Sequence, residues 1–151
     1  MISQELKSFA KEIELESETQ FNLRIKFGVS CIQRVKGLLT DNQVIEALAI
    51  GEKFIRGECG IEELKCAAAL ATKAAQSHAG SGSLDGCGNA AVSVSRGVAA
   101  ALSGRALEAS EYAAYASVYS YASYAVTDLS AYAPEQNWQV SYLKELAGTK
   151  A

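Results

Sequence analysis

Hydrophobic side chains recur along this chain with the three- and four-residue spacing of an α-helix. Leu6, Phe9 and Ile13 share one face of the first such segment, and similar stripes follow. No run of strand length alternates apolar and polar residues. The pattern predicts one all-α domain over residues 1–151, an irregular bundle or stacked helical hairpins, with about seven helices near 3–15, 17–39, 40–57, 61–79, 89–104, 105–127 and 134–146.

Local signals mark where several of these helices should begin. Ser17-x-x-Gln20 and Thr40-x-x-Gln43 have the capping-box pattern, in which a hydroxyl and an amide side chain satisfy free N–H groups. Pro134 suits a first helical turn, because its fixed φ and missing N–H cost nothing there. These signals predict starts for three of the helices.

Charge is distributed unevenly along the chain. Residues 1–65 carry 20 of the 31 charged side chains, whereas residues 66–127 carry only six and are rich in alanine. A segment so poor in charge is expected to supply the centre of the fold, with the first half forming much of the outer layer.

Composition also narrows the function classes. The net charge of -3 offers no basic surface for a nucleic acid backbone. The charge-free stretch 112–127 is too short and too polar to span a membrane, and the first residues lack a secretory pattern. The four cysteines have no C-x-x-C spacing, so we expect free thiols, a cytoplasmic protein, no metal and no cofactor.

One group of residues could form a small pocket. The glycine-rich segment 80–88 lies between His78 and a predicted helix, and Asp85 and Cys87 lie within it. Tyr112 and Tyr115 could close such a pocket. The segment lacks the lysine of a phosphate-binding loop, and no second histidine accompanies His78. We therefore expect no enzyme, and a ligand-binding or catalytic role of residues 78–89 stays an alternative.

The sequence leaves open whether two groups of polar side chains are buried or exposed. They are the five tyrosines on the predicted helix 105–127 and an arginine on the second helix. The tyrosine helix lacks charge around most of its surface, which favours a place in the core over an aromatic binding patch. Arg24 falls within an apolar arc, so it either extends to solvent or pairs with a carboxylate.

An acidic stretch near the start of the chain is the candidate partner-binding surface. A helix break near Ser17 would bring several of its carboxylates to one corner of the domain, where they could meet a basic partner. The alternative is an ordinary solvated face. The residues concerned are Glu12, Glu14, Glu16 and Glu18.

Most of the chain resembles a known bacterial family. The segments that carry the resemblance are LRIKF at 23–27, CIQRV at 31–35, VIEAL at 44–48, KFIRGE at 53–58 and IEELK at 61–65. The alanine-rich middle and the closing helix with Trp138 and Leu146 fit as well. The pattern is similar to the fifth family of immunity proteins of polymorphic toxin systems, over roughly residues 20–147.

The resemblance implies a non-enzymatic inhibitor that binds a cognate toxin protein and blocks it. A charged rim around a few anchoring side chains would be the expected interface. A helical scaffold that forms a homodimer is a further alternative.

Overall fold

The computed structural model describes residues 2–77, 86–121 and 128–148. Within these residues the chain forms α-helices and short 3₁₀ helices and no strand, so the all-α prediction is confirmed. The 3₁₀ helices are η1 (Glu18–Gln20), η2 (Lys36–Leu38) and η4 (Leu129–Tyr132). The α-helices are α1 (Gln4–Glu12), α2 (Phe21–Gln33), α3 (Asn42–Ile55), α4 (Ile61–Ser77), α5 (Gly86–Leu102), α6 (Ala106–Tyr121) and α7 (Ala133–Leu146).

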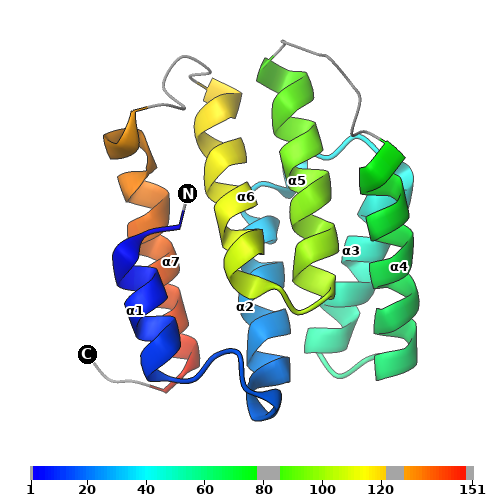
Figure 1. Cartoon of the computed structure of the whole chain (residues 1–151). Helices are drawn as coiled ribbons and strands as arrows, with labels where there is room; N and C mark the ends of the chain where they lie inside the picture. Colours follow the sequence, from blue (N-terminus) through cyan, green and yellow to red (C-terminus); the bar gives the residue numbers. More distant parts are fainter. Residues whose placement is uncertain (1, 78–85, 122–127, 149–151) are drawn as a thin grey trace.

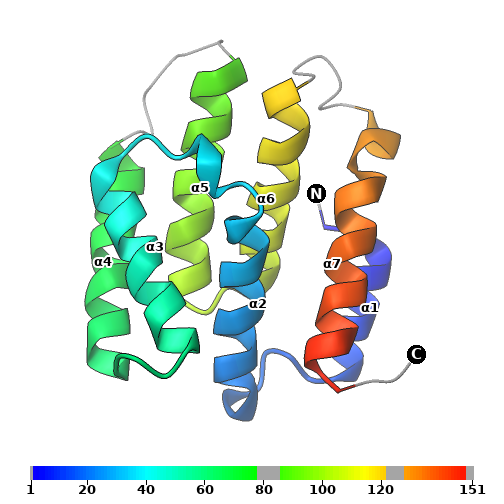
Figure 2. The same cartoon turned by 180° about the vertical axis from the view of Figure 1, so that it is seen from behind.

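The helices form two layers. One layer contains α1, α6, α5 and α4, and the other contains α7, α2 and α3 (Figures 1 and 2). Helix α5 packs against α2, α3, α4 and α6, and α2 packs against α3, α5, α6 and α7. Helices α5 and α2 are therefore at the centre of their layers, and α3 and α4 form one edge of the molecule. None of the described helices combines the length and the apolar character that a bilayer span requires.

The central position of α5 follows from its composition. Between Ala90 and Leu102, every residue except Val92 and Arg96 is buried. Small side chains let α2 approach closely, because a Cβ on Gly28 would lie only 3.2 Å from the Cα of Ala101. The prediction that the charge-poor segment supplies the centre of the fold therefore holds for α5.

The turn between α1 and α2 is held by an arginine. Helix α1 ends at Glu12, and the Arg24 guanidinium donates through Nη1 to the main-chain oxygens of Leu15 and Ser17, at 2.7 and 2.6 Å. Arg24 is half-buried. Neither sequence alternative describes it, because its partners are carbonyl oxygens and not solvent or a carboxylate.

The two predicted capping boxes do not form as expected. The Ser17 hydroxyl contacts the Thr19 hydroxyl at 2.9 Å and caps no α-helix, and α2 begins at Phe21. The second box is shifted by one residue, since Asp41 caps α3 and accepts from the N–H of Gln43. A carboxylate one residue further along replaces the threonine hydroxyl as the acceptor.

Candidate functional site

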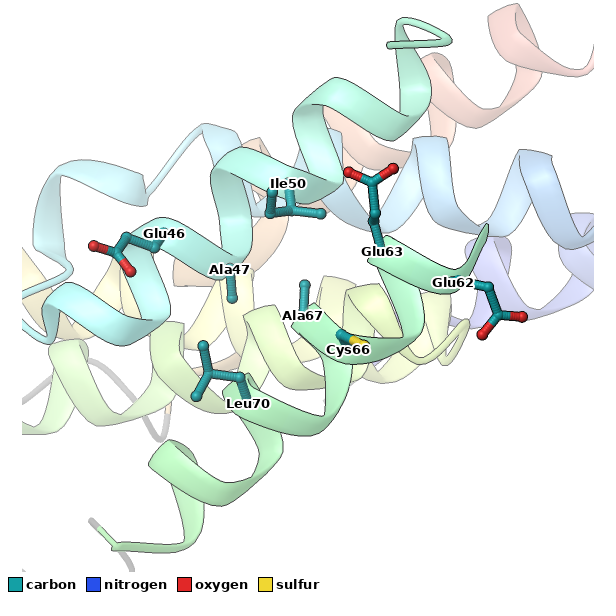
Figure 3. Close-up of a pocket in the computed structure, with 8 residues that line it drawn as sticks. All are labelled: Glu46, Ala47, Ile50, Glu62, Glu63, Cys66, Ala67 and Leu70. Atoms are coloured by element: carbon teal, nitrogen blue, oxygen red, sulfur yellow. The ribbon is translucent and has the colours of Figure 1, made fainter. Parts of the chain in front are cut away.

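A groove of about 480 Å³ lies between α3 and α4, at the edge of the molecule (Figure 3). Small side chains at Ala47 and Ala67 leave the space between the two helices. Ile50 and Leu70 add apolar surface, and Leu70 is 38% exposed. The remaining lining residues are Glu46, Glu62, Glu63 and Cys66.

The two helices leave this groove open because their most apolar faces point elsewhere. Helix α3 buries Val44, Ala47, Leu48 and Gly51, and α4 buries Leu64 and the alanines 67, 71, 74 and 75. The residues one step off these stripes are turned outward. The groove is therefore the junction of two helices whose contact is made by small residues, and larger side chains stand at its sides.

Exposed large hydrophobic residues are concentrated on the α3–α4 pair, and one of them, Leu70, lines the groove. Ile45 is 42% exposed, Ile61 is 40% exposed and Leu70 is 38% exposed. Of the exposed large hydrophobic residues in the described ranges, three belong to α3 or α4, and the fourth is Leu129 of η4. A concentration of exposed apolar surface on one edge is typical of a binding surface.

The charged residues that line the groove are all acidic. Glu46 lies at the end of the groove near Leu70, and Glu62 and Glu63 lie at the other end (Figure 3). All three are exposed, and Glu63 also accepts from the N–H of Gly60 at 3.2 Å. Carboxylates beside apolar surface favour a partner that combines aliphatic and basic side chains.

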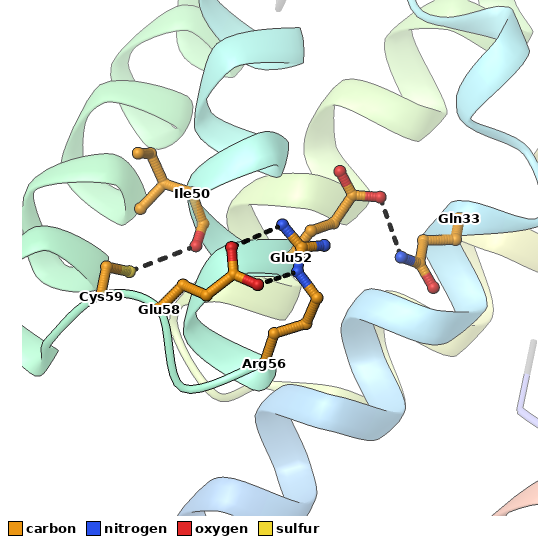
Figure 4. Close-up of polar contacts among 6 residues, drawn as sticks. All are labelled: Gln33, Ile50, Glu52, Arg56, Glu58 and Cys59. Carbon is orange, nitrogen blue, oxygen red and sulfur yellow. Dashed lines mark hydrogen bonds and ion pairs between the residues drawn. The ribbon is translucent and has the colours of Figure 1, made fainter.

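A cluster of polar contacts holds the far end of α3 against α2 and shapes the loop into α4 (Figure 4). Glu52 accepts from Gln33 Nε2 at 2.8 Å and from Lys36 Nζ at 3.3 Å, which ties α3 to the end of α2. In the loop, Arg56 binds Glu58 through two hydrogen bonds of 2.8 and 3.2 Å. These contacts hold the α3–α4 pair in place.

The same loop perturbs two titrating groups. The hydrogen bonds from Arg56 lower the pKa of the Glu58 carboxyl. The Cys59 thiol donates to the main-chain oxygen of Ile50 at 3.6 Å, and burial raises its pKa (Figure 4). A thiol with a raised pKa is less reactive, because the thiolate is the nucleophilic form. The hydrogen bond of the Cys59 thiol instead joins the loop to the main chain of α3.

The acidic stretch predicted from sequence lies away from this groove. Its four glutamates run from the last residue of α1 to the first residue of η1, and all four are exposed. The predicted break is present, because Glu14 adopts φ 53° where α1 ends. Helix α2 lies between this turn and the α3–α4 edge (Figures 1 and 2). The residues are Glu12, Glu14, Glu16 and Glu18.

Only some residues of the predicted pocket lie within the described part of the chain. His78, Asp85 and most of the glycine-rich segment lie outside the described residues. Tyr112 lines a separate pocket between α4, α5 and α6. Tyr115 belongs elsewhere, since it packs against the small cluster of Ala114, Val118 and Tyr132. Its ring is tilted against that of Tyr119, with ring centroids 5.5 Å apart.

The tyrosines of α6 are less buried than the charge-poor sequence around them predicts. Tyr112, Tyr115 and Tyr119 are half-buried, and the alanines beside them, such as Ala113 and Ala116, are the buried residues. Small alanine side chains let α6 approach its neighbours closely, so the larger rings are displaced to the edge of the packed face.

Nothing in the described part of the chain resembles a metal centre, since no three His, Cys, Asp or Glu side chains gather there. Its free cysteines differ in exposure: Cys31 is buried, Cys59 is half-buried and Cys66 is exposed.

Comparison with the models of known protein families gives a match. The model of a protein family described as Imm-5 like putative immunity protein matches residues 14–146. The comparison with curated proteins and the comparison with solved structures each returned no match. The matched range includes α2 to α7 and therefore both helices of the groove.

Proposed function

Because the chain belongs to the Imm-5 like immunity protein family, we propose that it neutralises a cognate bacterial toxin by binding that toxin directly in the cytoplasm. It acts as an inhibitor and catalyses no reaction. The toxin docks on the groove between α3 and α4, and the bound chain covers the toxin's active surface.

The observation that carries this assignment is the combination of exposed aliphatic side chains and an acidic rim at one edge of the molecule. Ile50 and Leu70 supply the apolar anchors in the groove, and Glu46, Glu62 and Glu63 supply the rim. Protein interfaces of moderate affinity have this anatomy, with a few anchors that exclude water and a charged surrounding that steers the partner.

A small-ligand role for the groove is less well supported. The groove is open along the helix pair, and the polar lining side chains are exposed glutamates and a cysteine. A small-molecule site usually encloses most of its ligand and places a few buried polar groups around it. An open apolar furrow fits the side chains of another protein better.

The proposal predicts a toxin gene beside the gene of this chain, and the test uses the toxin that such a gene encodes. The toxin domain is produced in an inactive form and its affinity for the chain is measured by titration calorimetry. Leu70→Asp places a charge in the groove, and Leu129→Asp makes the same change on η4, at a residue that is 60% exposed. Leu70→Asp should weaken binding by about thirtyfold or more, as for an interface anchor, and Leu129→Asp should leave the affinity within about twofold.

Two results would overturn the proposal. In the first, the wild-type chain fails to bind the toxin or to restore growth of cells that produce it. In the second, Leu70→Asp leaves toxin binding intact but separates a homodimer in light scattering, which would assign the groove to a second copy of the chain.

A further inference from the structure

A second pocket lies on the other flank of α4. It has a volume of about 180 Å³ and sits where α4, α5 and α6 run side by side (Figure 1). At 100° per residue, the α4 residues that line it point roughly opposite to those that line the groove. Among the described residues, its walls are Thr72, Ala75 and Gln76 of α4, Arg96 and Ala99 of α5, and Arg105 and Tyr112 beside and on α6.

Arg96 is the unusual residue of this pocket. It is the one charged side chain in the described part of α5, and it is half-buried. Within the described part of the chain its guanidinium forms no ion pair and no hydrogen bond. A partly desolvated guanidinium without an anionic partner costs free energy, so a bound anion would stabilise it.

Arg105 adds a second guanidinium to the same pocket. Its Nη1 donates to Glu108 at 2.6 Å, and that pair is about half exposed. Among the described residues that line the pocket, two guanidinium groups therefore face one paired carboxylate, Glu108 beside Arg105. Further N–H groups of Arg105 stay available, because a guanidinium has five donors.

The polar neighbours favour an acceptor as the ligand. The Gln76 amide and the Tyr112 hydroxyl can both donate. The Thr72 hydroxyl already donates to the main-chain oxygen of Ala68 at 2.8 Å. The N–H groups of a guanidinium form a planar fork, which matches the two oxygens of a planar anion such as a carboxylate.

We infer that this pocket binds one carboxylate, which the toxin supplies from an Asp or Glu side chain. The inference rests on the proposed function. The pocket is smaller than typical small-molecule sites, and a nucleotide would not fit, whereas a carboxylate on a short stem does. Helix α4 then offers an acidic apolar groove on one flank and a cationic pocket on the other, so the toxin can dock in only one orientation.

The first experiment needs no toxin. Acetate is titrated into the chain at constant ionic strength, and the side-chain N–H signals of Arg96 and Arg105 are followed by NMR. Saturable shifts are expected in the wild-type chain and in Lys73→Gln, a neighbouring exposed cation of α4 that does not line the pocket. Arg96→Gln should abolish them while the circular dichroism spectrum is kept. Unsaturable shifts, or identical shifts in Arg96→Gln, would overturn the site.

The same titration with inorganic phosphate separates the ligand classes. If phosphate saturates the shifts at a far lower concentration than acetate does, the pocket binds a phosphate group and the carboxylate assignment is overturned. Comparable or weaker binding supports the carboxylate.

The second experiment uses the toxin complex. Arg96→Gln should weaken toxin binding roughly tenfold to a hundredfold, the range of a charge-assisted hydrogen bond, and Lys73→Gln should change it less than about twofold. Arg96→Lys should recover part of the affinity, since it keeps the charge without the fork. If Arg96→Gln binds the toxin with full affinity, no toxin carboxylate occupies the pocket, and the proposed function is unaffected. Failure of the wild-type chain to bind the toxin would refute the proposed function itself, and the acetate result would remain.

Discussion

The guanidinium of Arg34, the residue that follows α2, lies over the indole ring of Trp138 of α7, with 4.0 Å between its carbon and the ring centroid. Its Nε and Nη2 donate to the Glu135 carboxylate at 2.7 and 3.1 Å. These hydrogen bonds raise the pKa of Arg34. Trp138 stacks on Tyr142, whose hydroxyl lies 3.0 Å from that of Ser30. This chain of contacts fastens α7 to α2.

We predict that Arg34→Ala costs about 1–2 kcal/mol of unfolding free energy. The Glu135 side chain is only 11% exposed. Without Arg34, its carboxylate would have no charged partner and little solvent around it. Solvent around the 40% exposed arginine keeps the loss below that of a fully buried pair. Urea unfolding measures it. Arg56→Ala is the control, because the Arg56–Glu58 pair is about half exposed and its removal should leave the midpoint unchanged. Equal losses in both variants would contradict the prediction.

Alkaline pH should destabilise the fold through Cys31. Burial raises the pKa of this thiol well above the usual 9.0, with a smaller contribution from the nearby Glu135 carboxylate. At a pH between the two pKa values, the Cys31 thiol therefore keeps its proton in the native state and loses it in the unfolded state. The contribution of Cys31 to stability is complete below pH 9 and is lost as the pH rises from 9 toward the native pKa, by up to about 1.4 kcal/mol per pH unit.

Urea unfolding at several alkaline pH values checks this, with Cys31→Ala as the comparison. The variant should be less stable at neutral pH, since it leaves a small cavity, but its stability should fall less steeply above pH 9. Groups other than Cys31 titrate in both proteins and cancel in the difference. Parallel curves for the two proteins would show that Cys31 does not contribute.

Gly28 should tolerate no larger side chain. A Cβ at this position would lie 3.2 Å from both the Cα and the Cβ of Ala101, so Gly28→Val must push α2 away from α5. We expect a loss of about 1–3 kcal/mol, as for overpacked cores. Gly37→Val is the matched control, because a Cβ there meets no neighbour within 4 Å. Thermal unfolding should separate the two, and an unchanged midpoint for Gly28→Val would mean that the helices shift apart freely.

The helices could be predicted from the sequence, because periodicity and capping residues are local properties. Ser3 caps α1 as a start signal should, and α7 begins with Pro134 in its first turn. The predicted 17–39 helix was too long at both ends. Arg24 donates to the carbonyl oxygens of Leu15 and Ser17, which lie before α2 and outside any α-helix. These hydrogen bonds join residues that are nine and seven positions apart. No local pattern shows such a contact.

The groove was missed for a related reason. Leu70 looks like a core residue in a sequence, and only the packing of α3 on α4 shows that it lies outside the buried stripe of α4. Its offset by one position from the buried Ala71 was the available signal. The acidic stretch, by contrast, was visible because charge runs need no tertiary contact.

The two acidic surfaces should affect toxin binding differently. The residues of the first stretch are exposed and carry no ion pair among the described residues, so their charge acts on the approaching partner from a distance. Changing all four to Gln shifts the formal net charge from -3 to +1. Association with a basic toxin should then slow several-fold and depend less on salt, while dissociation stays the same. The four are Glu12, Glu14, Glu16 and Glu18.

Neutralising the groove should change both rates. The triple variant Glu46→Gln, Glu62→Gln and Glu63→Gln removes carboxylates that border the apolar contact, so the complex should also dissociate faster. Stopped-flow association and dissociation at two salt concentrations distinguish the variants, with circular dichroism as the check on folding. If the four-residue variant associates as fast as the wild type, the N-terminal stretch is a solvated face. If that variant dissociates faster and the groove variant does not, the toxin docks at the turn between α1 and α2, and the groove is not its site.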